Sequence, residues 1–316
     1  MRLARGSGVD GLSAMAKISP PVACEKRPLL IRPLIDVPKA RLQATLEARG
    51  QDWIEDPSNT DLRFLRTRVR NFLERGEIEG LDNQRLATTA KHMARSRYAL
   101  EYYANAHLQK CFTFGMAGEM AGFGILDHQL FLDAPEEIQL RDLSRLVRVL
   151  GGAKYPPRLV SIENLLNQIV NGNLKGLTLG GVLFEPVDMP EKNKILVCRE
   201  AAAIADERAL EPGGTVLWDG RYHIHASKTA PAVMLGVLGE KGWLMLAKQY
   251  PDVTKTGCPY AARLALPALR NQGKFVAVPN LGYPELENTH WRFESALPSG
   301  LYFGDETGGA ENSKQH

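Results

Sequence analysis

The sequence Trp53-Ile-Glu-Asp-Pro-Ser-Asn-Thr-Asp-Leu-Arg-Phe-Leu-Arg-Thr-Arg-Val-Arg-Asn-Phe-Leu73 decides the fold of the first part of this chain. Its residues 56–59, Asp-Pro-Ser-Asn, predict a turn, because Asp and Asn bond nearby backbone groups and Pro fixes φ. Thr60 or Asp61 can then cap a helix. The apolar residues of that helix recur at helical spacing and predict one apolar stripe, made of Leu62, Leu65, Val69, Phe72 and Leu73.

Three arginines occupy the opposite side of the predicted helix. Arg63, Arg66 and Arg70 fall within about 60° of one another by helical geometry. The helix contains a single acid, Glu74, which lies one turn after Arg70, so Arg63 and Arg66 lack acidic partners one turn away. A guanidinium suits planar, two-point contact with phosphate. The arginines are therefore candidate phosphate-binding residues, and the alternative is a solvated helix face whose arginines pair with acids elsewhere, such as Glu55.

Positive charge is concentrated in the first third of the chain. Residues 1–110 contain 19 Lys and Arg against 13 Asp and Glu, whereas the remaining residues contain 20 against 23. The net charge of the 316 residues is +3, and 44% of them are hydrophobic, which is typical of a globular protein. The basic excess around the arginine helix favours a polyanionic partner.

Cysteine and histidine spacing predicts no metal site. Cys24, Cys111, Cys198 and Cys258 are too far apart for a CxxC pair, and isolated cysteines fit a reducing cytoplasm. His223 and His225 alternate on one predicted strand, but no third ligand is spaced near them. No apolar run approaches the roughly 20 residues that span a bilayer, so no membrane partner is expected.

Two glycine-containing segments, residues 76–80 and residues 212–214, are the predicted boundaries between the parts of the chain. Residues 29–34 predict a short buried strand, and a helix follows with Pro38 in its first turn. A long helix from Asp82 or Asn83 to about Lys110 is expected to turn one set of residues inward: Leu86, Ala90, Met93, Ala94, Tyr98 and Tyr102. Residues 125–132 predict a strand, Pro135 opens a helix, and residues 177–185 and 194–199 predict a hairpin. Beyond residue 212 the pattern is mostly short strands, with one helix over residues 261–269.

A short glycine-rich segment precedes these elements. Arg5, Gly6, Ser7 and Gly8 predict a loop, which could wrap a phosphate or be a plain flexible connection. These four residues are candidates for an active-site loop.

Several motifs occur in an informative order. Arg5-Gly6-Ser7-Gly8 with Gly11-Leu12 and Met15 is followed by Ile31-Arg32-Pro33-Leu34, by the segment from Trp53 to Asn59, and by Arg66 with Arg70. Together they resemble the bacterial tRNA(Ile)-lysidine synthetases, specifically over residues 1 to about 75. Later motifs resemble proteobacterial members more weakly: Leu177-Thr178-Leu179-Gly180-Gly181, Cys198-Arg199-Glu200-Ala201-Ala202 and Trp218-Asp219-Gly220-Arg221. Thr67 departs from the asparagine common between the family's two helix arginines.

The resemblance implies a fold and a reaction. It implies an α/β fragment of a nucleotide-binding, PP-loop ATPase-like domain over residues 1–78. An α+β tRNA-substrate module over 80–208, a small β-rich C-terminal domain over 212–304 and a disordered tail over 305–316 follow. Family enzymes use ATP with Mg²⁺ to adenylate the wobble cytidine of a minor isoleucine tRNA, and L-lysine then displaces AMP to give lysidine. Arg66 and Arg70 occupy the family's arginine positions, and Asp56 and Asn59 are expected to hold the turn that aims their helix.

One departure from the family pattern leaves two hypotheses open. The Ser-Gly-Gly-x-Asp-Ser loop of the family's ATP site does not occur in the 316 residues, so no catalytic residue is assigned. The sequence therefore predicts a truncated ligase that is inactive alone. Its expected partners are tRNA, a separately encoded nucleotide-binding half and, as a further candidate, a second copy of the chain. The alternative is a stand-alone tRNA-binding protein or an inactive relic.

Overall fold

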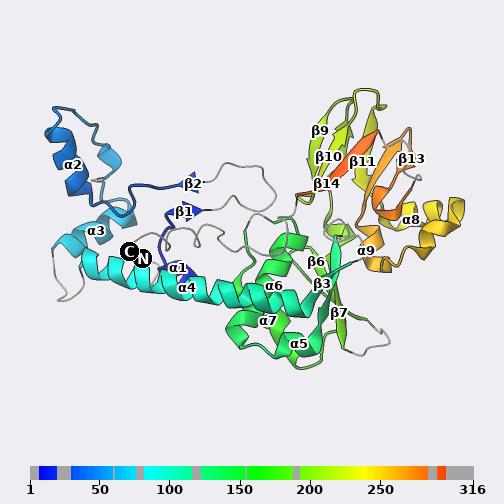
Figure 1. Cartoon of the computed structure of the whole chain (residues 1–316), viewed down its shortest axis with the longest axis horizontal. Helices are drawn as coiled ribbons and strands as arrows, with labels where there is room; N and C mark the ends of the chain where they lie inside the picture. The colour runs from blue at the N-terminus through cyan, green and yellow to red at the C-terminus, as the bar shows by residue number, and fades with distance from the viewer. Residues whose placement is uncertain are drawn as a thin grey trace, which may run out of the picture. The chain divides into compact units, whose positions relative to one another are not determined.

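The computed structural model describes residues 7–19, 30–59, 61–75, 82–115, 122–153, 155–187, 193–283 and 290–296. Among these residues, one compact unit ends at Leu100 and a second begins at Glu101. Helix α4 (Asn83–Cys111) contributes its first part to the first unit and its last three turns to the second (Figure 1). None of the described helices combines the length and apolar character needed to cross a membrane.

The first unit contains short elements. They are α1 (Val9–Leu12), β1 (Ile18–Ser19), β2 (Leu30–Ile31), α2 (Lys39–Glu47), the 3-10 turn η2 (Pro57–Asn59) and α3 (Leu65–Glu74). Strands β1 and β2 pair antiparallel. The prediction of a buried strand over residues 29–34 was wrong in extent and in burial. Of its described residues, 30–34, only Leu30 and Ile31 are extended as a strand, and both side chains are more than half exposed.

No apolar side chain is buried among the described residues of the first unit. Its buried residues are Ser13 and Thr67, and the most covered leucines of α2, Leu42 and Leu46, are half-buried. The predicted inward face of α4 was also wrong, because Tyr98 and other members of that set are exposed, and the helix buries residues only near its end. This part of the chain therefore has no hydrophobic core of its own among the residues described.

An antiparallel sheet with helices forms the first half of the second unit. Its strand order is β3-β4-β7-β6-β5. The strands are β3 (Phe112–Phe114), β4 (Phe123–Asp127), β5 (Leu177–Leu179), β6 (Val182–Val187) and β7 (Lys194–Arg199), and the helices are α5 (His128–Leu132), α6 (Glu136–Leu150) and α7 (Leu159–Val170). One apolar cluster joins the end of α4, helices α6 and α7, and one face of the sheet. Pro135 precedes α6 as predicted, and Gly151 follows its last residue.

The predicted strand over residues 125–132 was wrong in its second half. Strand β4 ends at Asp127, and α5 begins at the next residue. The Asp127 carboxylate accepts the N–H of Leu130 at 3.0 Å and so caps the helix. The apolar residues that follow therefore continue as a helical turn, although their composition also fits a strand.

The second half of the second unit, called the C-terminal domain below, contains two further antiparallel sheets, of orders β14-β10-β9 and β13-β12-β11-β8. Their strands are β8 (Arg208–Leu210), β9 (Thr215–Trp218), β10 (Tyr222–Ala226), β11 (Val233–Val237), β12 (Pro267–Asn271), β13 (Lys274–Ala277) and β14 (Trp291–Ser295). The helices are α8 (Gly239–Gln249), which the sequence did not predict, and α9 (Tyr260–Leu264). The predicted helix over residues 261–269 was too long, since β12 begins at Pro267. The predicted tail over 305–316 lies outside the described residues.

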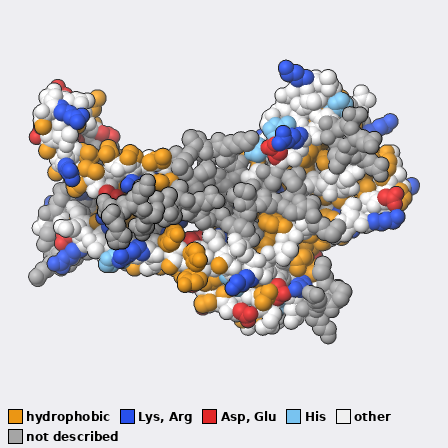
Figure 2. Space-filling model, in the orientation of Figure 1, with side chains coloured by type: hydrophobic (Ala, Val, Ile, Leu, Met, Phe, Trp, Pro, Cys, Tyr) orange, Lys and Arg blue, Asp and Glu red, His pale blue; other side chains and the backbone are white. Residues whose placement is uncertain are grey.

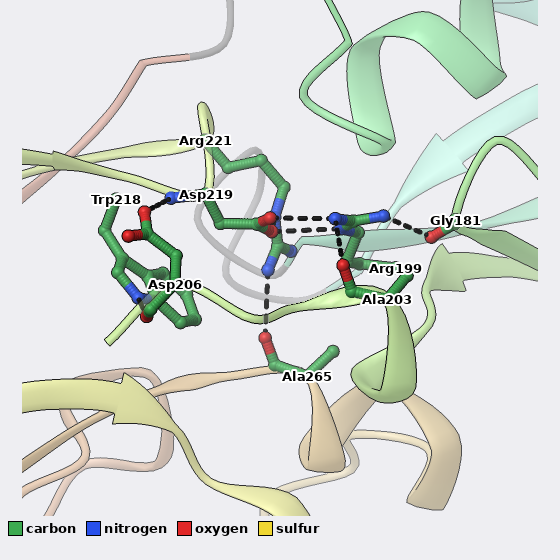
Figure 3. A network of polar contacts seen from close by, with 8 residues as sticks. All are labelled: Gly181, Arg199, Ala203, Asp206, Trp218, Asp219, Arg221 and Ala265. Atoms are coloured by element: carbon green, nitrogen blue, oxygen red, sulfur yellow. Dashed lines mark hydrogen bonds and ion pairs between the residues drawn. The ribbon is translucent and has the colours of Figure 1, made fainter. Parts of the chain in front are cut away.

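The module and the C-terminal domain share a core and a polar network. The second apolar cluster combines Phe123, Leu196 and Cys198 of the module's sheet with Trp243 of α8 and Ala262 of α9. Beside it, Asp219 in the β9–β10 turn accepts hydrogen bonds from Arg199 and Arg221 (Figure 3). The two halves of the second unit are therefore packed together rather than joined by a linker alone.

Candidate nucleic-acid interface

The predicted turn at residues 56–59 is present. The Asp56 carboxylate accepts the backbone N–H of Ser58 at 2.8 Å, and the Asp56 carbonyl accepts the N–H of Asn59 at 3.0 Å. The hydrogen bonds from Ser58 lower the pKa of Asp56, and the charge of Arg66 adds to the effect. The acidic turn is thus held ionised in front of helix α3.

Arg63 does not lie on the arginine helix. Helix α3 begins at Leu65, after an extended Phe64, so Arg63 belongs to the preceding turn. Its guanidinium forms a two-point ion pair with Asp61, at 2.8 Å from Nε and 2.7 Å from Nη2 to Oδ2. The helical grouping of Arg63 with Arg66 and Arg70 was therefore wrong. The physical reason is that Asp61 bonds both the backbone N–H and the side chain of Arg63 and holds the turn before the helix starts.

Arg66 and Arg70 remain together on α3. They are four residues apart, so they project from the same side of the helix. Both are exposed, and among the side chains that the structure describes, which do not include that of Glu74, neither has a carboxylate within ion-pair distance. The guanidinium carbon of Arg66 lies 5.2 Å from the centre of the Phe64 ring, over its face. Two exposed cations one turn apart can contact adjacent phosphates of a nucleic acid.

Glu55 is not the partner of these arginines. Its carboxylate lies 3.2 Å from Lys39 Nζ and accepts the indole N–H of Trp53 at 3.1 Å. The Trp53 hydrogen bond and Lys39 lower the pKa of Glu55. Glu55 therefore attaches its segment to α2 and leaves the α3 arginines available.

The sequence missed which residue of α3 is buried. Thr67 is 3% exposed, whereas the expected stripe is only partly covered, with Leu65 and Phe72 exposed. Thr67 was noted only as a departure from the family pattern, and its burial carried no sequence signal, because a single threonine between arginines matches no apolar period.

The glycine-rich loop is described only in part. Arg5 and Gly6 lie outside the described residues. Ser7 and Gly8 precede α1, and Gly8 has an ordinary extended conformation with open space where a side chain would project. No structural requirement for glycine at position 8 is therefore visible, and the role of this loop in an active site stays a prediction.

Basic residues of α4 pair with acids within the first unit. Arg97 Nε lies 2.9 Å from Asp10, and Lys91 Nζ lies 3.6 Å from Asp36. These contacts tie α4 to the α1 segment and to the turn before α2. They make Lys91 and Arg97 weaker candidates for phosphate contact than Arg66 and Arg70.

Comparisons with known proteins identify the family of the chain. Residues 1–76 match a family model described as a PP-loop domain. The tRNA(Ile)-lysidine synthase of Ruegeria pomeroyi is 35% identical to this chain over 308 residues, which cover 95% of the chain and 67% of that protein. The chain belongs to the tRNA(Ile)-lysidine synthase family. The enzyme of the same name from Methylobacterium nodulans is 38% identical over 190 residues, and that of Wolbachia pipientis wMel is 27% identical over 294.

Membership of the lysidine synthase family confirms the predicted fold class. The first part of the chain carries a PP-loop domain, and modules of helices and antiparallel sheets follow it. The matched regions cover 67%, 54% and 62% of the three relatives, so the chain spans about two-thirds of their length or less. At least part of the nucleotide-binding region of the family is therefore present in residues 1–76. The boundaries predicted between the domains stay predictions.

Proposed function

We propose that this chain takes part in tRNA modification, as the tRNA-binding and distal part of an ATP-dependent ligase. That ligase joins lysine to the wobble cytidine of a minor isoleucine tRNA and forms lysidine. The observation that carries the proposal is the extent of the similarity to the Ruegeria pomeroyi enzyme, which continues over 95% of the chain. A similarity confined to the PP-loop domain would support nucleotide binding alone.

The arginine pair on α3 supports a role in binding tRNA. Arg66 and Arg70 are exposed, share one side of the helix and follow a turn held by Asp56. Their charges would lie against phosphates of the tRNA backbone or of the reacting nucleotide. The proposed reaction uses ATP and L-lysine as substrates and requires Mg²⁺. A cytoplasmic location is consistent with this reaction. Among the described residues, Arg66 and Arg70 are the candidate groups for binding phosphate, and we assign no residue to Mg²⁺ or to L-lysine.

The activity is tested with the chain as it exists. The purified chain is incubated with ATP, lysine and a transcript of the isoleucine tRNA bearing the CAU anticodon, and AMP release and lysidine are measured. A parallel reaction adds a polypeptide that carries the Ser-Gly-Gly-x-Asp-Ser loop of a relative. We expect lysidine only in the second reaction. Product in the first reaction would contradict the need for a nucleotide-binding half. No product in either, with tRNA bound, would favour a stand-alone tRNA-binding protein.

The surface of the first unit supports the need for additional polypeptide. The three clusters of buried apolar residues found in the described part of the chain all begin at Leu108 or later. Trp53, Ile54 and Phe64 are among the exposed large side chains before it. Ile54 is 97% exposed. Figure 2 shows hydrophobic side chains on the visible surface of this unit, at the left of the view. Each apolar side chain that a partner covered would contribute about 1.5–3 kcal/mol.

Hydrogen exchange tests this surface separately from the reaction. Amides of α2 and α3 should exchange much faster than those of α6 and α7, because they lack a buried apolar layer. Adding the nucleotide-binding half should slow exchange in α2 and α3 and leave α6 and α7 unchanged. Equal protection in the chain alone would contradict the proposed surface, whatever the outcome of the lysidine assay.

A further inference from the structure

Three side chains with metal-binding atoms meet where α4 ends. His107 and Cys111 are one turn apart on α4, and Asp142 projects from α6. A ring nitrogen, the sulfur and a carboxylate oxygen of the three all lie within 4.8 Å of one another. Cys111 is 2% exposed and the Asp142 side chain is fully buried. Neither tRNA binding nor the ligase reaction as proposed above uses this cluster.

The imidazole of His107 is oriented by a backbone carbonyl. Its Nε2 lies 3.0 Å from the carbonyl oxygen of Leu130, so Nε2 carries a proton and donates it. Nδ1 then faces Asp142 Oδ2 at 2.6 Å and Cys111 Sγ at 3.8 Å. Metal-binding histidines are usually oriented in this way, with the other ring N–H donated to a carbonyl or carboxylate.

Asp142 has an oxygen without a partner. Oδ1 is buried and has no hydrogen-bond partner among the described residues. The neighbouring Arg145 donates to Glu101 and Asn105 instead. A buried carboxylate oxygen left unpaired costs free energy, and such groups often indicate an ion or water.

We propose that His107, Cys111 and Asp142 bind a divalent transition-metal ion, with Zn²⁺ the best fit. Imidazole, thiolate and carboxylate are the ligands that Zn²⁺ takes in proteins. Tetrahedral Zn²⁺ would separate nitrogen from sulfur by about 3.6 Å, close to the 3.8 Å found here. It would separate nitrogen from oxygen by about 3.3 Å, so Asp142 must withdraw from its present hydrogen bond or bind through Oδ1. A water molecule would complete the coordination from the side where His107 is 14% exposed.

Charge and proton balance favour this ion. Without a metal, one proton lies in the 2.6 Å contact between Nδ1 and Asp142 Oδ2, and the buried Cys111 sulfur is a free thiol. The entering ion displaces both protons, one from sulfur and one from the His107–Asp142 pair. The two positive charges of Zn²⁺ are then balanced by one thiolate and one carboxylate, and the net charge of the buried cluster does not change.

The fold explains why spacing in the sequence predicted no metal site. The two ligands on α4 follow a His-x-x-x-Cys spacing, and the third comes from a helix that lies beyond strands β3 and β4. A lone His-x-x-x-Cys pair is a weak signal without that third residue.

Co²⁺ provides the test, because thiolate-bound tetrahedral Co²⁺ absorbs in the near ultraviolet and strongly in the visible. The full chain is treated with a chelator, desalted and titrated with Co²⁺ and then Zn²⁺. We expect a charge-transfer band at one equivalent of Co²⁺, its loss on adding Zn²⁺, and about two protons released per ion in weak buffer. Cys111→Ser should abolish the band, and the matched control Cys258→Ser, another buried cysteine, should retain it.

The wild-type titration decides the proposal even if Cys111→Ser does not fold. Absence of a thiolate band in the folded wild-type chain, or a band that persists in Cys111→Ser, would overturn it, and His107 and Asp142 would then share only a proton. The test uses neither tRNA nor ATP, so it is independent of the proposed function.

Discussion

Arg199 and Asp219 form a two-point ion pair between the last strand of the α+β module and the β9–β10 turn of the C-terminal domain. Nε of Arg199 lies 3.0 Å from Oδ2 of Asp219, and Nη2 lies 2.8 Å from Oδ1. Arg221 donates to the same carboxylate at 2.6 Å. Arg199 also donates to the backbone carbonyls of Gly181 and Ala203, and Arg221 donates to that of Ala265 (Figure 3). One carboxylate therefore pairs with two buried guanidiniums.

Removing the charge of Asp219 should strongly destabilise the C-terminal domain. We expect Asp219→Asn to lower the free energy of unfolding by about 3 kcal/mol or more, because both arginines stay buried without a counter-charge. Asn tolerates the left-handed backbone at this position, where φ is 49°. Urea unfolding followed by tryptophan fluorescence measures the change, since Trp218, Trp243 and Trp291 all lie in this domain.

The matched control is Asp252→Asn. Asp252 pairs with Lys255 on the surface, where its side chain is 89% exposed, so little change is expected. Equal destabilisation by the two substitutions would contradict the importance of the buried network.

A side chain on Gly152 should destabilise the protein more than a side chain on Gly172. Both follow a helix and both have left-handed φ values, 63° and 64°. A Cβ on Gly152 would overlap the Asp219 carbonyl oxygen, but a Cβ on Gly172 would meet open space. Gly172→Ala should cost about 1 kcal/mol for backbone conformation. Gly152→Ala should cost about 1–3 kcal/mol more, because backbone must move. Thermal unfolding of the two variants measures the difference, and equal midpoints would exclude a tight backbone contact at Gly152.

Local sequence signals correctly predicted the start of a helix where a single residue determines it. Asp82 accepts the N–H of Arg85 and begins α4, and Pro135 precedes α6, as predicted. Asp219-Gly220, a dipeptide typical of hairpin turns, connects β9 to β10, and both residues have positive φ. In each case the deciding interaction joins residues within three or four positions.

Tertiary contacts decided what the sequence missed. Periodicity placed an apolar face on the first part of α4, yet within the described structure no element buries it. Helix α8 contains two glycines, Gly239 and Gly242, so its propensity is poor, and Trp243 and Leu246 hold it in the second apolar cluster. Arg63 was assigned to α3 because its spacing fitted, whereas Asp61 holds it in a turn. The spacing of apolar residues along a helix does not show whether another element of the fold will pack against that face.

Acid should weaken the cap of α5 through Asp127. Its carboxylate lies 2.6 Å from Lys194 Nζ and caps the helix, and these hydrogen bonds, that of Lys194 first, lower its pKa from the ordinary value of 3.8. A lowered pKa gives stability that is present above pH 3.8 and is lost as pH falls through the folded-state pKa. The stability difference between wild type and Asp127→Asn should therefore be constant near neutral pH and shrink below about pH 4.

Unfolding in urea across a pH series from neutral to acid measures this difference. Asp133→Asn is the matched control, because Asp133 is exposed at the other end of the same helix. A difference that grew as the pH fell would show that Asp127 does not have a lowered pKa.

The last prediction concerns Arg66 and Arg70. If both contact phosphates of tRNA, Arg66→Ala or Arg70→Ala should weaken binding and reduce the slope of log affinity against log salt by about one unit per lost contact. Arg49→Ala is the control, since Arg49 is also exposed in the first unit but lies after α2. Arg63→Ala distinguishes the two arrangements of this segment, because its guanidinium is already bound to Asp61 and should release fewer counterions. Affinity is measured with the same tRNA across a salt series. Unchanged slopes in folded Arg66 and Arg70 variants would leave this side of α3 as ordinary solvated surface, and a slope lost only in Arg63→Ala would move the contact to the turn.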